Sequence, residues 1–350
     1  MANIEFRKST PADRGRILDI LRINAPHVPQ ELRVKLFDWQ FGHANPHSDG
    51  RGTFWLAVVD GEVSGVNGLM PVKLRYKGQN LLGAWSCDTL VPETHRGMGL
   101  GKGLLTKMSQ EADVVMCYGI SDMSDTILVK LGWEINPDCR GLFYYVAEKG
   151  LKGVIKNARS ALPRWINRPP QQPGLEIKTN ESQRFGDEID ALWSASEAGY
   201  HNTVVRDAAY LNWRYRDHPS LHYVAYEARR AGVLVAVMIA RHDAVESVIV
   251  DYCGPTEHEA EKAALLEAAV TDLSGRGTQR IRCETTDAVL LKLLGRSGFR
   301  QTQADFRFRA WSNQPGDSNL GVNWFVTAGD SDNDSSMVAK LAELRAESRS

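Results

Sequence analysis

A glycine-rich loop between an apolar segment and a predicted helix is the part of this sequence that points most directly to chemistry. Its four glycines fall within seven positions: Gly97, Gly99, Gly101 and Gly103. Glycine lets a backbone turn tightly and leaves its N–H groups uncovered, and the start of a helix adds partial positive charge. The loop is therefore predicted to cradle a pyrophosphate group.

The spacing of the loop excludes two common nucleotide sites. A P-loop has a glycine separated by four residues from a Gly-Lys pair, and Arg96 occupies that position before Gly101 and Lys102. The dinucleotide pattern G-x-G-x-x-G also fails, because Lys102 or Leu104 stands at its last position. ATP hydrolysis and NAD or FAD binding are thus disfavoured.

The loop matches a different pattern, Arg/Gln-x-x-Gly-x-Gly/Ala, over Arg96–Gly101, and follows Val91 and Pro92. It resembles the GNAT superfamily of acyl-CoA-dependent N-acyltransferases. A strand at 114–121, a helix at 126–130 and the Gly132-Trp133 pair extend the resemblance. It implies acetyl-CoA or another acyl-CoA as co-substrate and no metal. The residues that it assigns to CoA are Leu90, Val91, Arg96, Gly97, Met98, Gly99, Leu100, Gly101, Lys102 and Ser121.

The chemistry implied by this resemblance is direct attack of an amine on the thioester, which needs a base for the ammonium and an acid for the departing thiolate. Asp88, on the strand before the loop, is the first candidate base; a turn carboxylate satisfied by backbone amides is the other interpretation. The family's usual tyrosine acid is replaced by Leu128. Tyr118, Ser124 or water is expected to substitute, which leaves a non-catalytic acyl-CoA-binding scaffold as an alternative.

The expected acceptor is a primary amine on a small molecule or saccharide, with amino sugars and polysaccharide precursors first. Two stretches rich in histidine and aromatic residues, 24–48 and 197–219, are expected to recognise it, with a sugar ring stacked on Trp39 or Trp213. Packed structural roles are the alternative for these side chains. The candidate histidines are His27, His43, His47, His201 and His218.

An internal repeat indicates two domains of one kind. Residues 37–41 (FDWQF) are echoed by residues 211–215 (LNWRY), and a predicted hairpin follows each copy. We predict an α/β chain of two tandem GNAT-like domains, each a twisted mixed sheet flanked by helices. The predicted ranges are 1–148 for the acyl-CoA domain, 149–174 for a basic linker, 175–312 for a degenerate GNAT-like domain and 313–350 for a terminal strand and polar tail.

The second domain and the linker differ from the first domain in ways that the sequence shows. Residues 250–262 carry glutamates and no glycine cluster where a second cradle would lie, so this domain is not expected to bind CoA. The linker contains an amphipathic basic segment that could rest on a membrane surface. We favour the interpretation that it covers a protein core, and we expect residues 331–350 to be mobile or loosely docked.

Composition is typical of a cytoplasmic enzyme. The 350 residues contain 42 Lys and Arg against 43 Asp and Glu, so the net charge of −1 gives no general attraction for nucleic acid. This balance also argues against a peptidoglycan-bridge type of aminoacyltransferase, which would bind charged tRNA. The five cysteines lack metal-site spacing and are expected to be reduced.

Overall fold

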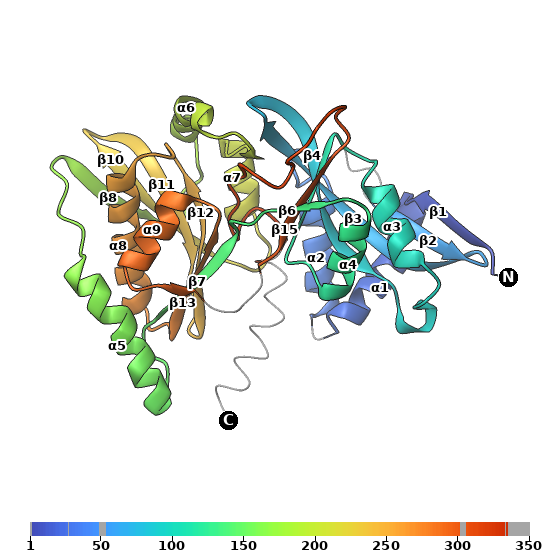
Figure 1. The fold of residues 1–350 in the computed structure, drawn as a ribbon, viewed down its shortest axis with the longest axis horizontal. Coiled ribbons are helices and arrows are strands. Elements are labelled where there is room, and N and C mark those ends of the chain that lie inside the picture. Colours follow the sequence, from blue (N-terminus) through green and yellow to red (C-terminus); the bar gives the residue numbers. More distant parts are fainter. Residues whose placement is uncertain (1, 27, 49–53, 302–305, 333, 335–350) are drawn as a thin grey trace.

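A computed structural model describes residues 2–26, 28–48, 54–301, 306–332 and 334. They form two domains, each built on a mixed β-sheet flanked by helices (Figure 1), as the sequence predicts. In spatial order, the first sheet contains β1 (Ile4–Lys8), β2 (Phe54–Val59), β3 (Glu62–Tyr76), β4 (Gln79–Leu90), β5 (Val114–Tyr118), β15 (Phe308–Ser312) and β6 (Glu134–Ile135), with β9 (Thr203–Val204) paired to β3. The second contains β14 (Arg300–Gln301), β7 (Arg140–Tyr145), β13 (Arg280–Thr285), β12 (Glu246–Cys253), β11 (Val233–Arg241), β10 (Tyr223–Arg230) and β8 (Leu175–Asn180).

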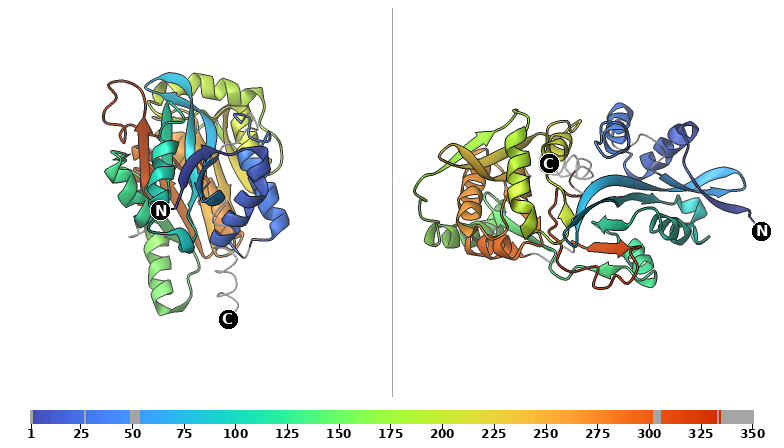
Figure 2. Two further views of the ribbon diagram at one scale, coloured as in Figure 1. Left: turned by 90° about the vertical axis from the view of Figure 1, so that its right-hand side faces the viewer. Right: turned by 90° about the horizontal axis from the view of Figure 1, so that it is seen from above.

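Helices cover both faces of the first sheet (Figure 2). Across both domains, the described residues form the α-helices α1 (Arg14–Asn24), α2 (Gln30–Phe41), α3 (Leu100–Met108), α4 (Asp122–Lys130), α5 (Gly150–Ile166), α6 (Asp187–Ser196), α7 (Ala208–Tyr215), α8 (Glu259–Gly275) and α9 (Ala288–Arg296). α1 and α2 lie on one face of the first sheet, and α3 and α4 lie on the other.

The repeated hairpins close with the same turn chemistry. Both turn residues have positive φ in Asp60-Gly61, which joins β2 to β3, and in Ala231-Gly232, which joins β10 to β11. Two successive positive φ values match the right-handed twist of the flanking strands, and glycine adopts them without a Cβ clash. The two predicted hairpins are therefore confirmed, one in each domain.

The two sheets exchange strands. β7 follows β6 along the chain, yet it pairs with β13 and β14 in the second sheet. β15 follows β14, yet it pairs with β5 and β6 in the first sheet. In Figure 1 this is visible as the green β7 in one domain and the red β15 in the other. Each sheet is completed only by the other half of the chain.

This exchange differs from the sequence-based ranges. Residues 140–145 fall within the range predicted for the first domain but belong to the second sheet, and the last strand lies at 308–312, before the predicted terminal strand. In the described part of 313–334 the β-structure consists of isolated bridges at Trp324 and Thr327. Hydrophobic periodicity locates strands but carries no information about which sheet they join.

The repeated tryptophans meet between the domains. The Trp39 indole N–H donates to the Trp213 carbonyl oxygen and the Trp213 indole N–H donates to the Trp39 carbonyl oxygen, each at 2.9 Å. Their rings stack with centroids 5.2 Å apart, and both residues are buried. The expectation that either ring stacks on a sugar is therefore wrong, because both rings are buried and each N–H already has a protein partner.

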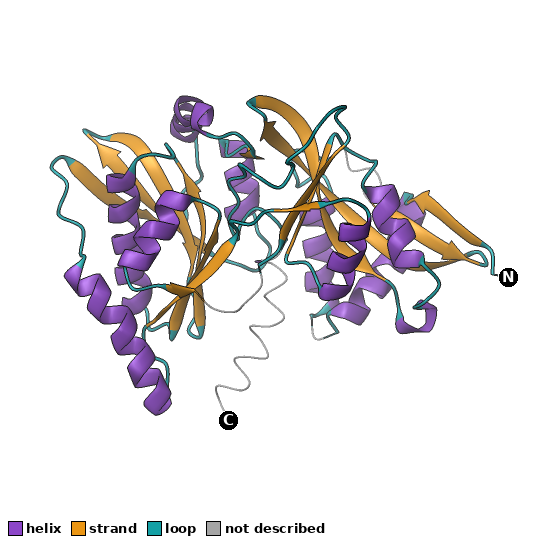
Figure 3. Ribbon diagram, viewed as in Figure 1, coloured by secondary structure: helices purple, strands orange, loops and turns teal. Residues whose placement is uncertain are grey.

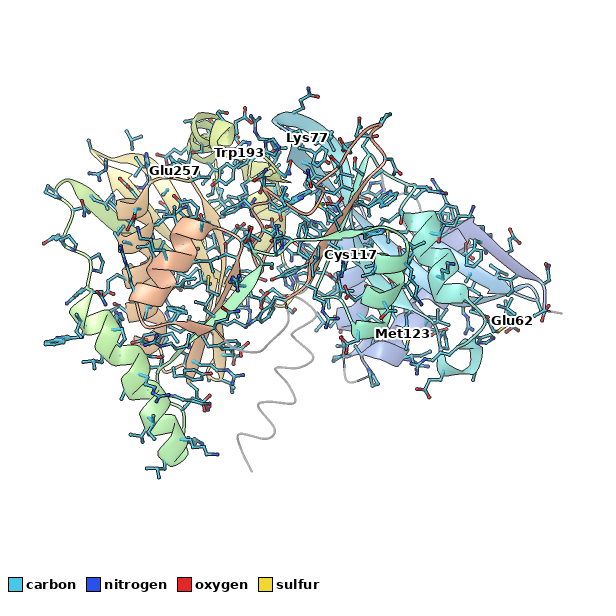
Figure 4. The ribbon with its side chains drawn as sticks, viewed as in Figure 1. Glu62, Lys77, Cys117, Met123, Trp193 and Glu257 are labelled. Atoms are coloured by element: carbon cyan, nitrogen blue, oxygen red, sulfur yellow. The ribbon has the colours of Figure 1, made fainter. Side chains whose placement is uncertain are left out.

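The β3–β4 hairpin also reaches the second half of the chain. β3 pairs with β9 through Leu74 with Val204 and Arg75 with Thr203. At the hairpin tip, labelled by Lys77 in Figure 4, the Lys77 backbone N–H donates to the Asn202 side chain at 2.8 Å. The two domains are thus joined by backbone hydrogen bonds as well as by side chains.

Because each sheet needs a strand from the other half, we expect the two domains to unfold together. Phe308 on β15 is fully buried against Trp85 and Trp324. Phe308→Ala should lower the free energy of unfolding by about 3–5 kcal/mol, the range for a large aromatic side chain removed from a core. Differential scanning calorimetry should show one transition in both proteins, moved as a whole in the variant. Two transitions, with only one of them moved, would contradict strand exchange.

Candidate active site

The first sheet opens into a wedge beside the glycine-rich loop. The parallel strands β4 and β5 pair only through Ala84 with Val115 and Trp85 with Met116, and then diverge. β15 pairs with β5 along its other edge. A cavity of about 280 Å³ occupies the wedge, and its lining residues are Ser86, Cys87, Asp88, Thr89, Leu105, Cys117, Tyr118, Gly119, Ile120, Ser121, Ser124, Leu128 and Asp332. Figure 4 shows Cys117 on the side of the first domain that faces the second.

Asp88 lies on a β-bulge at this wedge. Cys87 pairs with Gly68 and Leu90 pairs with Val66, so two residues of β4, Asp88 and Thr89, oppose the single residue Asn67. Asp88 has a φ of 48°, a conformation that aspartate and asparagine adopt more readily than most other residues. Bulges reorient side chains and end strand pairing, and they are frequent beside active sites. The bulge explains why this carboxylate lines the cavity.

Asn67 holds the bulge from the neighbouring strand. Its amide nitrogen donates to the Ser86 hydroxyl at 2.9 Å and to the Thr89 hydroxyl at 2.6 Å, on the two sides of Asp88. Asn67 itself is fully buried. The strained backbone of Asp88 is therefore fixed by two flanking hydrogen bonds.

The surroundings of Asp88 favour its protonated form. Burial and the carboxylate of Asp332 raise the pKa of Asp88 from 3.8 to about 7, while Arg33 acts in the opposite direction. Burial also raises the pKa of Asp332. A base with a pKa near the working pH is well matched to accepting a proton from an ammonium group.

The loop has the geometry that its glycines predict. Gly97 and Gly99 have φ of 83° and 79°, and a Cβ on either would meet no atom within 4 Å. Gly99 is the N-cap of α3, and the Gly103 N–H donates to the Gly99 carbonyl oxygen at 3.0 Å. The N–H groups of residues 100–102 precede this first helical bond and have no acceptor inside the helix. Open space above free N–H groups fits a pyrophosphate.

The structure separates the candidate proton donors. Ser124 lines the cavity near Ser121, with the two hydroxyl oxygens 3.2 Å apart. Tyr118 donates its hydroxyl proton to Glu284 of β13, and burial raises its pKa well above the ordinary value. The Tyr118 hydroxyl thus makes a hydrogen bond across the interface between the domains, whereas Ser124 lines the cavity. Leu128 contributes a buried apolar side chain to the cavity wall.

Sequence reasoning missed Asp332, which reaches the cavity from the C-terminal segment. Buried arginines of the second half hold this segment on both sides. Arg206 donates to both oxygens of Asp330 at 2.8 Å, and Arg241 donates to Asp334 at 3.0 Å. Arg214 donates to the backbone oxygens of Gly329 and Ser331.

The described residues of the predicted tail, Ser331, Asp332 and Asp334, are therefore packed rather than loosely docked; residues 335–350 lie outside the described residues. Acidic residues in a polar tail are typical of a solvated end. The apolar run Trp324–Val326 just before them was the available signal that this segment is packed.

The equivalent wedge of the second sheet is filled by the chain itself. β12 and β13 pair from Glu246 with Arg280 to Ile249 with Cys283, and beyond that point residues 324–329 lie between them. Thr286 and Val326 exchange hydrogen bonds, and the Gly329 N–H donates to the Val250 oxygen at 2.9 Å. At the start of α8, the buried Lys262 ammonium donates to the Thr256 oxygen at 2.6 Å. These contacts occupy the part of the second sheet that corresponds to the first wedge.

The predicted acceptor histidines are not at the wedge. His27 lies outside the described residues, and none of the other four lines the cavity. His218 packs on Trp39 with ring centroids 4.5 Å apart, and its Nδ1 accepts the Leu221 N–H at 3.0 Å. Burial lowers the pKa of His218 to about 3, so it is a neutral structural residue.

Comparison with solved structures identifies the fold as that of the GCN5-related N-acetyltransferases, in tandem. A GCN5-related N-acetyltransferase from Anabaena variabilis matches with a TM-score of 0.63 and 12% identity, over 88% of this chain and 72% of the other. One from Kribbella flavida gives 0.60 and 13%, over 88% and 71%. Saccharomyces cerevisiae N-myristoyltransferase, solved with bound myristoyl-CoA, gives 0.58 and 11%, over 92% and 84%. No family profile matches, and no curated protein matches.

Replacing Gly99 tests the position of the cradle. Gly99→Val would strain a φ of 79° and place a branched side chain over the free N–H groups. Gly232→Val is a matched control, because Gly232 has a φ of 83° and equally open space but lies in a hairpin turn of the second domain. Both variants should lose similar stability, while only Gly99→Val should abolish the rise in melting temperature on adding acetyl-CoA. An unchanged rise in Gly99→Val would place the pyrophosphate elsewhere.

Proposed function

We propose that the protein is an N-acyltransferase that moves an acetyl or short acyl group from acyl-CoA to a primary amine. The observation that carries the proposal is the Asp88 carboxylate on a bulge inside the β4–β5 wedge, next to a loop whose free N–H groups suit a pyrophosphate. The fold shared with N-acetyltransferases supports the same chemistry. Amino sugars and polysaccharide precursors are the first acceptors to test.

The residues of the wedge divide the binding task. We assign the pyrophosphate to the N–H groups of residues 97–102, and the exposed side chains of Arg96 and Lys102 at the loop support this assignment. Beyond Trp85, the edge of β4 that faces the wedge has lost its β5 partner, so backbone groups up to Leu90 and Val91 are placed to pair with the amides of the pantetheine arm. Bound acyl-CoA supplies the thioester carbonyl and the thiolate leaving group.

Asp88 and Ser124 divide the proton transfers. Asp88 takes one proton from the acceptor ammonium, which frees the nitrogen lone pair to form the C–N bond as the C–S bond breaks. The nitrogen must lose a second proton to become an amide, and this proton passes through the Ser124 hydroxyl or water to the departing thiolate, which leaves as the CoA thiol. The Asp332 carboxylate keeps the pKa of Asp88 high and adds negative charge that favours a cationic acceptor.

Asp88→Asn tests the base. Asparagine tolerates a left-handed backbone, so the bulge should persist while kcat/KM falls by about a hundredfold or more. The measurement is release of the CoA thiol from acetyl-CoA with a panel of amines, glucosamine first. In the unmodified protein kcat/KM should rise with pH around a midpoint near 7, as Asp88 loses its proton.

Stability provides the folding control for this variant. Because the pKa of Asp88 is raised in the folded state, its contribution to stability is lost as pH rises from about 4 to about 7. Asp88→Asn should therefore match the unmodified protein at pH 4 and be more stable at pH 8. Full activity in the variant would exclude Asp88 as the base, and acyl-CoA binding without turnover of any amine would favour the scaffold alternative.

Asp332→Asn tests whether the C-terminal segment tunes Asp88. Removing this charge should lower the pKa of Asp88 and move the acid midpoint of the kcat/KM profile to lower pH, with a small change in the plateau. The exposed Glu62 provides a control, Glu62→Gln, which should leave the midpoint in place. A loss of stability without a shift of the midpoint would show that Asp332 acts only in packing.

A further inference from the structure

α5 presents its apolar side to solvent. Figure 3 shows the helix on the outer side of the second domain. Its exposed large apolar residues are Leu151 (82% exposed), Val154 (62%), Ile155 (51%), Leu162 (58%), Trp165 (78%) and Ile166 (65%). The interpretation favoured from the sequence, that this helix covers a protein core with its apolar face, is therefore wrong.

The opposite side of α5 attaches it to the second domain. The buried Ser160 hydroxyl accepts the Tyr145 N–H at 3.0 Å, and Asn157 exchanges two hydrogen bonds with the backbone of Glu148, each at 3.1 Å. Arg164 donates to both oxygens of Glu267 at 2.9 and 3.0 Å. A Cβ on Gly298 would lie 2.0 Å from the Ser160 carbonyl oxygen, so α5 packs directly against that turn. The helix cannot turn its apolar side inward without breaking these contacts.

The charged side chains of α5 itself are all basic, although Lys156 lies 4.0 Å from Glu148. At about 100° per residue the apolar residues form a stripe about 120° wide, and Lys152, Lys156 and Arg159 follow one edge of it. α5 contains no acidic residue, and Arg168, which is paired with Glu267 at 3.4 Å, is 72% exposed just beyond the end of the helix. The whole chain has a net charge of −1, so this concentration of cations is local.

We propose that α5 is a membrane-surface helix that binds the protein to bilayers rich in anionic lipids. An apolar stripe edged by lysine and arginine, with tryptophan near one end, suits the boundary between lipid headgroups and acyl chains. Because α5 itself carries no acidic residue, a negatively charged surface is a better match for it than a protein partner with mixed charges. Among the helices of the described ranges, none is long and apolar enough to cross a membrane. The proposed contact lies along the helix, and it is independent of the proposed acyl transfer.

Cosedimentation of the full chain with lipid vesicles tests the apolar stripe. The protein should bind vesicles made of equal parts phosphatidylglycerol and phosphatidylcholine. It should bind vesicles of phosphatidylcholine alone much more weakly. Leu151→Ser with Trp165→Ser should weaken binding by about tenfold or more, because both side chains leave the apolar boundary. Val233→Ser is the matched control, since Val233 is 64% exposed at the start of β11 and not on α5. All of these side chains are exposed, so melting temperatures should be unchanged.

The charged edge is tested separately. Lys152→Gln with Arg159→Gln should weaken binding by about fivefold for each cation, and added salt should have a similar effect. Lys178→Gln, on β8, should leave binding unchanged. The proposal is overturned if the unmodified protein stays in the supernatant, or if binding ignores lipid charge and all of these substitutions. A dimer that the Leu151 and Trp165 substitutions dissociate, without vesicle binding, would also overturn it and assign the stripe to a second copy.

Discussion

The reciprocal exchange of β7 and β15 is the constraint on which the rest of the structure depends. β15 completes the first sheet beside β5, and β5 forms one wall of the wedge that holds Asp88. β7 completes the second sheet beside β13, and its last residue, Tyr145, is one of the points where α5 is attached. The Trp39 and Trp213 pair lies between the halves with matching hydrogen bonds. The wedge is consequently built from both halves of the chain, although the glycine-rich loop beside it lies in the first half.

The two wedges of this repeated fold differ in what occupies them. In the second sheet, residues 324–329 take the space between the diverging strands, and their hydrogen bonds satisfy strand groups that would otherwise need a ligand. The same segment then continues to the first wedge, where Arg206, Arg214 and Arg241 fix it and Asp332 faces the cavity. Filling one site therefore positions a charged group in the other. The second domain thereby contributes to the shape of the candidate active site.

The sequence predicts the local parts of this architecture and misses the long-range ones. The glycines of the loop, the paired turns and the repeated tryptophans carry conformational information in their own residue types, so the backbone geometry of the loop, the hairpins and the tandem fold could be predicted. The partner of a strand depends on the whole topology, which is why the exchange of β7 and β15 could not be. The role of Asp332 depends on arginines about 90–125 positions away. The amphipathic pattern of α5 was recognised, but the pattern is the same whether its apolar side faces a core or solvent.

Isothermal titration calorimetry of the full chain with acetyl-CoA tests most directly the claim that one wedge receives acyl-CoA and the other receives the chain's own C-terminal segment. The account predicts saturation at one acetyl-CoA per chain, because within the described ranges the first domain combines an open wedge with free loop N–H groups, whereas residues 324–329 occupy the second wedge. Saturation at two per chain would show that residues 324–329 leave the second wedge open to ligand. The absence of binding would contradict the proposal that the glycine-rich loop binds the pyrophosphate of acyl-CoA.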